Sequence, residues 1–100
     1  MPGIQSLVNT AYRRTRITKP LTVVKLDFEG LPVRVSIKKI KEMTVEQPEA
    51  TYEVTVDRPK VEKLKLTWAY KYGDGLTVGA PRGQGLYAKT LTIAVCEKLG

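Results

Sequence analysis

An alternation of apolar and polar residues runs through most of the chain after residue 20 and constrains its fold more than any other feature. The segments that carry it are 21–28, 32–38, 51–57 and 61–72. Because successive side chains of a β-strand point to opposite faces, a period of two predicts strands with one buried and one exposed face. Glu29, Gly30 and Leu31 predict a hairpin turn, in which Gly30 can take a positive φ. Most of the chain is therefore expected to form an antiparallel sheet.

The two ends of the chain follow, or can follow, the helical period instead. In residues 4–14 the apolar side chains share one helix face, formed by Ile4, Leu7, Val8, Ala11 and Tyr12. Residues 86–99 fit both periods, since Tyr87, Leu91 and Val95 belong to either pattern. The run Thr-Leu-Thr-Ile-Ala-Val is rich in β-branched residues, which favours a strand over 86–96.

Together these segments predict one α+β domain. Its expected parts are an N-terminal helix packed on a mainly antiparallel sheet, or on a small partly open barrel, of five to six strands. A chain of 100 residues can bury a single modest core. A short return strand is expected at 76–78, after the turn at 73–75, whereas residues 40–46 fit no pattern clearly.

Charge is clustered along the sequence. The first 26 residues contain no acid but hold five cations, Arg13, Arg14, Arg16, Lys19 and Lys25. Residues 43–57 contain no cation but hold four acids, Glu46, Glu49, Glu53 and Asp57, with Glu42 directly before them. The net charge is +7. Because clustered cations attract phosphates, these features favour a polyanionic partner such as nucleic acid.

The residue types that most catalytic and metal sites need are scarce. The chain has no histidine and one cysteine, Cys96, so it offers neither a Cys–His pair nor a zinc site. Cys96 is expected to be a buried apolar thiol. The acidic segment lacks the spacing of a calcium loop, and residues 79–85, GAPRGQG, lack the ending of a P-loop. We therefore expect a non-enzymatic domain without a cofactor or metal ion.

Three groups of cations are candidates for phosphate contacts. They are Arg13, Arg14 and Arg16 at the end of the helix, Lys63, Lys65 and Lys71 on one face of the strand 61–72, and Arg82 in the glycine-rich loop. Each group has a simpler alternative, namely a helix end with a favourable dipole, a solvated strand face and a loop connection. The other face of the strand carries Trp68, Tyr70 and Tyr72, which could stack bases or belong to the core.

Residues 24–43, VKLDFEGLPVRVSIKKIKEM, resemble the opening hairpin of the small 7-kDa DNA-binding chromatin proteins of hyperthermophilic archaea. The matching residues are Val24, Lys25, Phe28, Gly30, Val35, Ile37, Lys39, Ile40 and Lys41. The resemblance implies an SH3-like barrel that binds duplex DNA non-specifically in the minor groove and kinks it. The chain departs from that family at Thr44, where the family has its groove-facing Trp, in a long insertion that follows, and in its N-terminal helix.

The leading expectation is a small basic protein that binds nucleic acid through phosphate contacts, largely independently of base sequence. The alternative is a protein–protein adaptor or inhibitor, for example an accessory protein of a virus or mobile element from a thermophile, that docks through its acidic segment or a sheet edge. A homodimer formed through the N-terminal helix is a third alternative. One Asn and three Gln beside eleven Lys favour a thermophilic source. An intracellular protein without a membrane partner is expected, because no apolar run or signal-peptide pattern is present.

Overall fold

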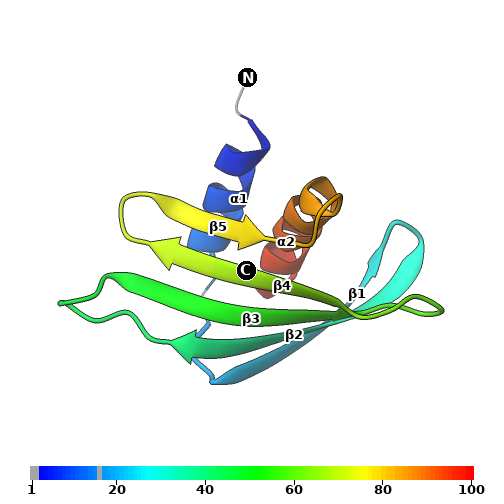
Figure 1. Ribbon diagram of the computed structural model, residues 1–100, viewed down its shortest axis with the longest axis horizontal. Coiled ribbons are helices and arrows are strands. Elements are labelled where there is room, and N and C mark those ends of the chain that lie inside the picture. The colour runs from blue at the N-terminus through cyan, green and yellow to red at the C-terminus, as the bar shows by residue number, and fades with distance from the viewer. Residues whose placement is uncertain (1–2, 16) are drawn as a thin grey trace.

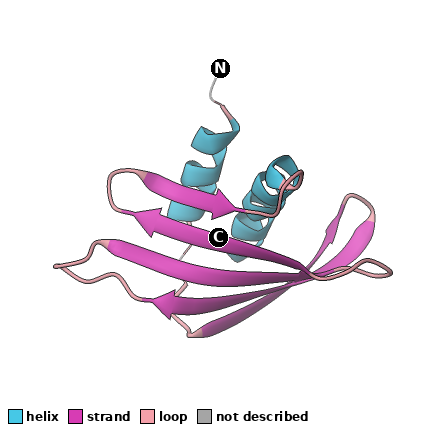
Figure 2. Cartoon of the chain, viewed as in Figure 1, coloured by secondary structure: helices cyan, strands magenta, loops and turns pink. Residues whose placement is uncertain are grey.

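The computed structural model describes residues 3–15 and 17–100. Its elements are α1 (Ile4–Arg13), β1 (Leu21–Phe28), β2 (Leu31–Lys41), β3 (Glu49–Asp57), β4 (Leu64–Lys71), β5 (Gly75–Gly79) and α2 (Gly85–Leu99). The strands form one antiparallel sheet in the order β1-β2-β3-β4-β5, and both helices lie on one of its faces (Figure 1, Figure 2). The α+β prediction is confirmed, with an open sheet instead of a barrel.

The alternation in the sequence decides which face of each strand is buried. The buried apolar strand residues are Val24, Val33, Val35, Ile37, Ala50, Tyr52, Val54, Val56, Leu64, Leu66, Trp68 and Leu76. The pairing keeps these side chains in rows, since Val24 lies opposite Val35 and Val35 lies opposite Val56. The sheet therefore has one apolar face under the helices and one exposed face, which we call the outer face.

The turn between β1 and β2 lies where the sequence predicts it, but it is one residue shorter, because Leu31 already belongs to β2. Glu29 and Gly30 have φ values of 52° and 80°. Two positive φ values in a two-residue loop give a turn of type I′, whose twist matches that of the paired strands. This turn sets the register of the hairpin, in which Phe28 lies opposite Leu31.

Residues 85–99 form the helix α2, so the predicted strand over 86–96 is wrong. The buried residues of α2 are Ala88, Leu91, Thr92, Val95 and Cys96, and their spacing is that of one helix face. Two threonine hydroxyls bond within the helix. Thr92 Oγ1 donates to the Ala88 carbonyl at 2.7 Å, and Thr90 Oγ1 donates to the Leu86 carbonyl at 2.8 Å. Burial of this face against the sheet and α1 outweighs the β-propensity of the local composition.

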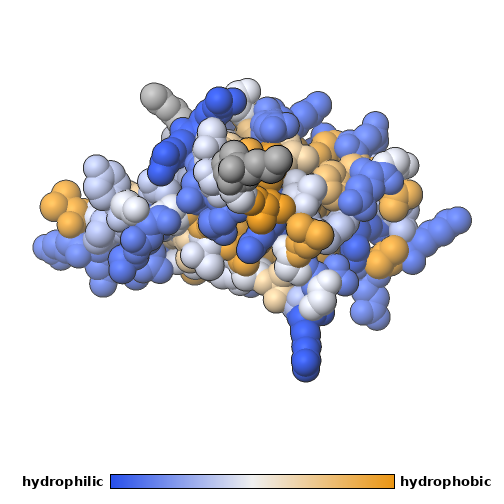
Figure 3. Space-filling view, turned by 90° about the horizontal axis from the view of Figure 1, so that it is seen from above, coloured by the Kyte–Doolittle hydropathy of each residue, from blue (hydrophilic) through white to orange (hydrophobic). Residues whose placement is uncertain are grey.

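α1 packs beside α2, and Val8 and Ala11 are its buried residues. Leu7, which the helical period placed on the apolar face, is 49% exposed. Seen from the side of the helices, apolar side chains reach the surface in separate patches among hydrophilic ones (Figure 3).

The aromatic face of β4 belongs largely to the core. Trp68 is fully buried, and its Nε1 donates to Thr92 Oγ1 at 3.1 Å. Tyr70 is partly buried, whereas Tyr72 is exposed just beyond the end of the strand. The base-stacking alternative is therefore wrong for Trp68, because helix α2 covers the ring.

Candidate functional site

A cavity of about 510 Å³ lies where the β1–β2 hairpin extends past the end of β3. Four cations line it, namely Lys25 of β1, Arg34 of β2, Arg58 after β3 and Lys98 of α2. These residues are far apart in the sequence and come together only because the hairpin, the β3–β4 connection and α2 meet here. We call this site the cationic cavity.

The strand register explains why charges gather at this end of the sheet. Lys25 lies opposite Arg34, and Arg34 lies opposite Asp57. Directly opposite residues have Cβ atoms about 4.5–5.5 Å apart, so the three form one row across three strands. Asp27 and Asp57 are the carboxylates among the lining residues. The lining therefore has a surplus of two positive charges.

Arg58 is the cation with the most defined surroundings. Its guanidinium carbon lies 5.3 Å from the centroid of the Tyr87 ring, and its Nη2 donates to the Glu62 carbonyl at 3.1 Å. Its Nε is buried and has no hydrogen-bond acceptor among the described residues. A buried donor without an acceptor is costly, and only the exposed part of the guanidinium is open to a bound anion.

The rest of the lining is apolar and comes from Leu26, Val33, Pro32 and Pro59. The packing of Phe28 edge-on against Tyr87, with ring centroids 5.4 Å apart, joins the hairpin to α2 beside it. A concave site with an apolar lining and a few convergent charges is typical of ligand sites, whose volumes run from about 300 to 1,000 Å³. The cationic cavity has the chemistry to hold an anionic group together with a less polar part of the same molecule.

The cations predicted from the sequence do not form one site. Arg13 and Arg14 are exposed at the end of α1, on the helical side of the sheet. Arg16 lies outside the described residues. Lys65 and Lys71 are exposed on the outer face, because the alternate residues of β4 are buried under the helices. The helix-end group and the strand group therefore lie on opposite sides of the sheet.

The remaining two predicted cations lie in loops, outside the strands and helices. Lys63 is exposed directly before β4. Arg82 is exposed in the loop between β5 and α2, where Gly83 has a φ of 84°. Neither lines the cationic cavity.

The strand β3, which carries acids of the acidic segment, lies between β2 and β4, which carry cations. Opposite-charge residues face one another across the strands in the pairs Lys38 with Glu53, Arg34 with Asp57 and Lys71 with Glu49. β3 is thus an acidic row between basic neighbours, an arrangement that stabilises a sheet. The charge clusters along the sequence therefore do not become separate faces, and the lysines of β4 do not form a uniformly basic platform.

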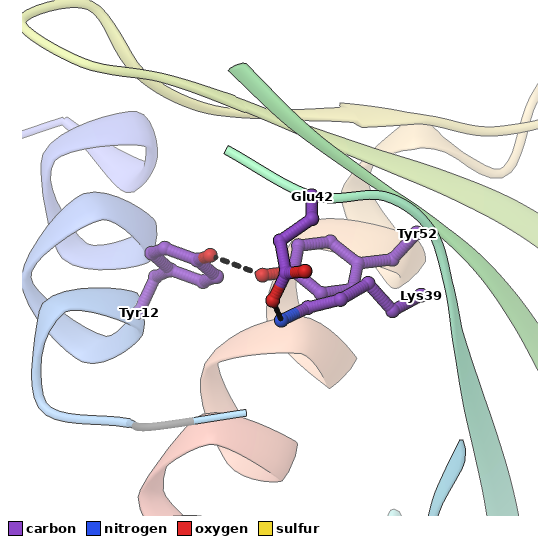
Figure 4. Close-up of polar contacts among 4 residues, drawn as sticks. All are labelled: Tyr12, Lys39, Glu42 and Tyr52. Carbon is purple, nitrogen blue, oxygen red and sulfur yellow. Dashed lines mark hydrogen bonds and ion pairs between the residues drawn. The ribbon is translucent and has the colours of Figure 1, made fainter. Parts of the chain in front are cut away.

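A second polar cluster connects α1 to the sheet (Figure 4). The hydroxyls of Tyr12 and Tyr52 are 2.8 Å apart, and Tyr12 stacks on Tyr70 with centroids 4.8 Å apart. Burial, and then the hydrogen bond to Tyr52, raise the pKa of Tyr12 well above its usual value, so its hydroxyl stays protonated. Lys39 forms an ion pair with Glu42 at 3.4 Å. We interpret this cluster as structural.

Cys96 is fully buried, as the sequence predicted. Burial, and then the charge of Glu97, raise the pKa of its thiol to about 12, so the reactive thiolate is rare near neutral pH. Among residues 3–15 and 17–100, no group of three or more histidines, cysteines and acids could hold a metal ion. Within the same part of the chain, no helix is long and apolar enough to cross a membrane.

Sequence reasoning missed Arg58 and Lys98 as site residues. Lys98 could not be placed because residues 86–96 were expected to be a strand, and nothing local marks Arg58 as unusual. A signal existed for the other two cations, since a two-residue turn at Glu29 and Gly30 sets Lys25 opposite Arg34. Comparisons with family models, curated proteins and solved structures found no match to this chain.

Proposed function

We propose that the protein binds nucleic acid through phosphate contacts, largely independently of base sequence, with the cationic cavity as the centre of the interface. The observation that carries this proposal is the cavity at this end of the sheet, whose lining residues come from distant segments and include four cations. Two of the four are arginines, whose planar guanidinium groups match the oxygens of a phosphate.

The charge balance favours a polymer over a single small anion. Inside the cavity the surplus is only two positive charges, because Asp27 and Asp57 offset two cations. The whole chain has a net charge of +7, so cations outside the cavity can contact neighbouring phosphates of the same strand. On the outer face these further contacts would come from Lys65 and Lys71, with Lys63 beside them.

The apolar lining and the carboxylates give the cavity a second role in this proposal. Leu26, Pro32 and Pro59 offer surface for a sugar or base edge next to a bound phosphate. Carboxylates accept hydrogen bonds from base amino groups or from a sugar hydroxyl. Any preference for RNA over DNA would depend on these contacts.

The experiment is a salt series of binding to labelled duplex and single-stranded DNA, followed by fluorescence anisotropy. Four phosphate contacts give a log–log slope of roughly −3.6 on duplex DNA and roughly −2.8 on a single strand. The double variant Arg34→Gln, Lys98→Gln removes two contacts and should reduce the duplex slope to roughly −1.8. Arg58→Lys keeps the charge but removes the planar fork, so it should weaken binding with a smaller change in slope.

The matched control is Arg13→Gln, Arg14→Gln, which removes the same charge at the exposed end of α1, outside the cavity. We expect this control to leave the slope close to that of the unchanged protein. If the control abolishes the slope and the cavity variant does not, the interface lies at the end of α1. Absence of binding at about 50 mM salt contradicts the proposed function altogether.

One observation favours a second candidate function, that of a protein–protein adaptor or inhibitor, such as an accessory protein of a virus or mobile element from a thermophile. The loop between β2 and β3 carries Val45, which is fully exposed, and Met43, which is 39% exposed, beside the acids Glu42 and Glu46. Exposed apolar side chains bordered by acids fit a basic partner protein with an apolar groove. Val45→Ser with Glu46→Lys should abolish binding to such a partner and leave DNA binding unchanged.

A further inference from the structure

The two edge strands of the sheet, β1 and β5, differ in the hydrogen bonds that their outward main-chain groups make. At the β5 edge, Asn9 Oδ1 accepts the Leu76 amide at 3.0 Å, and Gln5 Nε2 donates to the Leu76 carbonyl at 2.6 Å. Gln5 Nε2 also donates to Asn9 Oδ1 at 3.0 Å, which ties the two side chains together. α1 therefore satisfies the outward amide and carbonyl of Leu76 as a neighbouring strand would.

The β1 edge has no such cover. β1 pairs with β2 on one side, and among residues 3–15 and 17–100 its main chain has no other hydrogen-bond partner. In Figure 1 it is the last strand of the sheet on that side. The strand is eight residues long and contains neither proline nor a bulge, the features that usually block an edge.

We propose that β1 pairs in antiparallel fashion with β1 of a second copy of this chain, about a two-fold axis at Leu26. This inference goes beyond the proposed function and does not depend on it. The axis is perpendicular to the sheet, so the outer faces of both copies stay on one side and their helices on the other. The result is one continuous sheet formed from the five strands of each copy.

Charge complementarity selects this register. With Leu26 opposite its own copy, Lys25 lies opposite the partner's Asp27, and Asp27 lies opposite the partner's Lys25. All four charged side chains are on the outer face, since β1 alternates and Val24, directly before Lys25, is buried on the other face. If the partner's β1 slides by two residues in one direction, Lys25 lies opposite the partner's Lys25. If it slides by two residues in the other direction, Asp27 lies opposite the partner's Asp27. Both shifts place like charges directly opposite, which is unfavourable.

The apolar side of the pairing agrees with the same register. Leu26 would meet the partner's Leu26, and Phe28 would meet the partner's Val24. Leu26 and Phe28 are only partly buried in one copy, although both pack against the core. Pairing covers this remaining apolar surface and extends the core across the two-fold axis.

The test uses charge reversal in the whole protein, with the mass followed by analytical ultracentrifugation in the absence of nucleic acid. Lys25→Asp alone and Asp27→Lys alone each set like charges opposite at two symmetric positions. We expect either change to raise the dimer dissociation constant by at least about tenfold. An equimolar mixture of the two variants restores both opposite-charge pairs, so it should form a heterodimer about as stable as the original dimer.

Lys65→Asp on β4 is the control for charge alone, and it should leave the dissociation constant unchanged. The fluorescence of the buried Trp68 shows that each variant is folded. A protein that stays monomeric at concentrations up to about 1 mM overturns the proposal. So does a dimer that neither reversal weakens, or a mixture of the two variants that stays monomeric.

Discussion

Asn9 makes the contact that holds α1 to the edge of the sheet, and its replacement gives the most informative stability prediction. Its Oδ1 accepts the Leu76 amide at 3.0 Å, and Leu76 is fully buried. Asn9→Ala removes the only acceptor that this amide has among the described side chains. The amide of Leu76 then lies on the outer edge of β5 without a partner.

The magnitude follows from two opposing effects. An unsatisfied buried amide costs about 1–3 kcal/mol. Alanine has a higher helix propensity than asparagine and returns about 0.6 kcal/mol. Asn9→Ala should therefore lower the free energy of unfolding by about 0.4–2.4 kcal/mol, which corresponds to a fall in Tm of roughly 2–19 °C for a domain of this size.

Thermal and urea unfolding followed by Trp68 fluorescence measure this loss. Asn9→Asp keeps an acceptor of the same shape and should retain most of the stability. Thr10→Ala, at an exposed position of the same helix, controls for helix propensity and should be neutral or slightly stabilising. The reasoning is refuted if Asn9→Ala and Thr10→Ala have the same effect, or if hydrogen exchange of the Leu76 amide does not accelerate in Asn9→Ala.

Three further predictions concern the core and the turns. In urea unfolding, Gly75→Ala should lower the free energy of unfolding more than Gly30→Ala does. Both glycines have a positive φ, but only at Gly75 would the added Cβ meet the Asn9 side chain, at 2.5 Å. Equal losses would contradict the close packing at Gly75. Thr92→Val leaves the Trp68 Nε1 without an acceptor and should cost about 1–3 kcal/mol, whereas Thr92→Ser keeps the acceptor and should cost less. Burial raises the pKa of the Cys96 thiol to about 12, so the native state keeps the thiol proton at pH values where the unfolded state has lost it. The free energy of unfolding should therefore fall as the pH rises from about 9 to about 12. Cys96→Ala should remove that part of the pH dependence.

The sheet could be predicted because its signals are local. Alternation identifies the buried face of each strand, and Gly30 marks the position of the first hairpin turn. The register of that hairpin was not predicted, because the expected turn included Leu31, which the structure places in β2. The contact between Asn9 and β5 could not be foreseen in this way. A single polar residue on an amphipathic helix does not indicate that its side-chain oxygen will accept a hydrogen bond from a strand amide 67 positions away.

The second helix and the cationic cavity were missed for one shared reason. Thr90, Thr92 and Ile93 favour a strand locally, and only burial against Trp68 and α1 makes the helix the better choice. Because Lys98 belongs to that helix, its position beside the hairpin was also unpredictable. The clustering of charge was misleading as well, since antiparallel pairing places the acidic strand between basic ones.

The most direct test of the proposed interface is the side-chain resonance of Arg58 during a titration with a short DNA duplex at low salt. The Arg58 Nε is buried beside Tyr87, so its N–H proton is protected from solvent and suited to nitrogen–proton correlation spectroscopy. We predict that this resonance shifts on binding, together with the amides of Lys25 and Arg34. Binding that leaves all three unchanged and shifts the amides of Lys63–Lys71 instead would contradict the account.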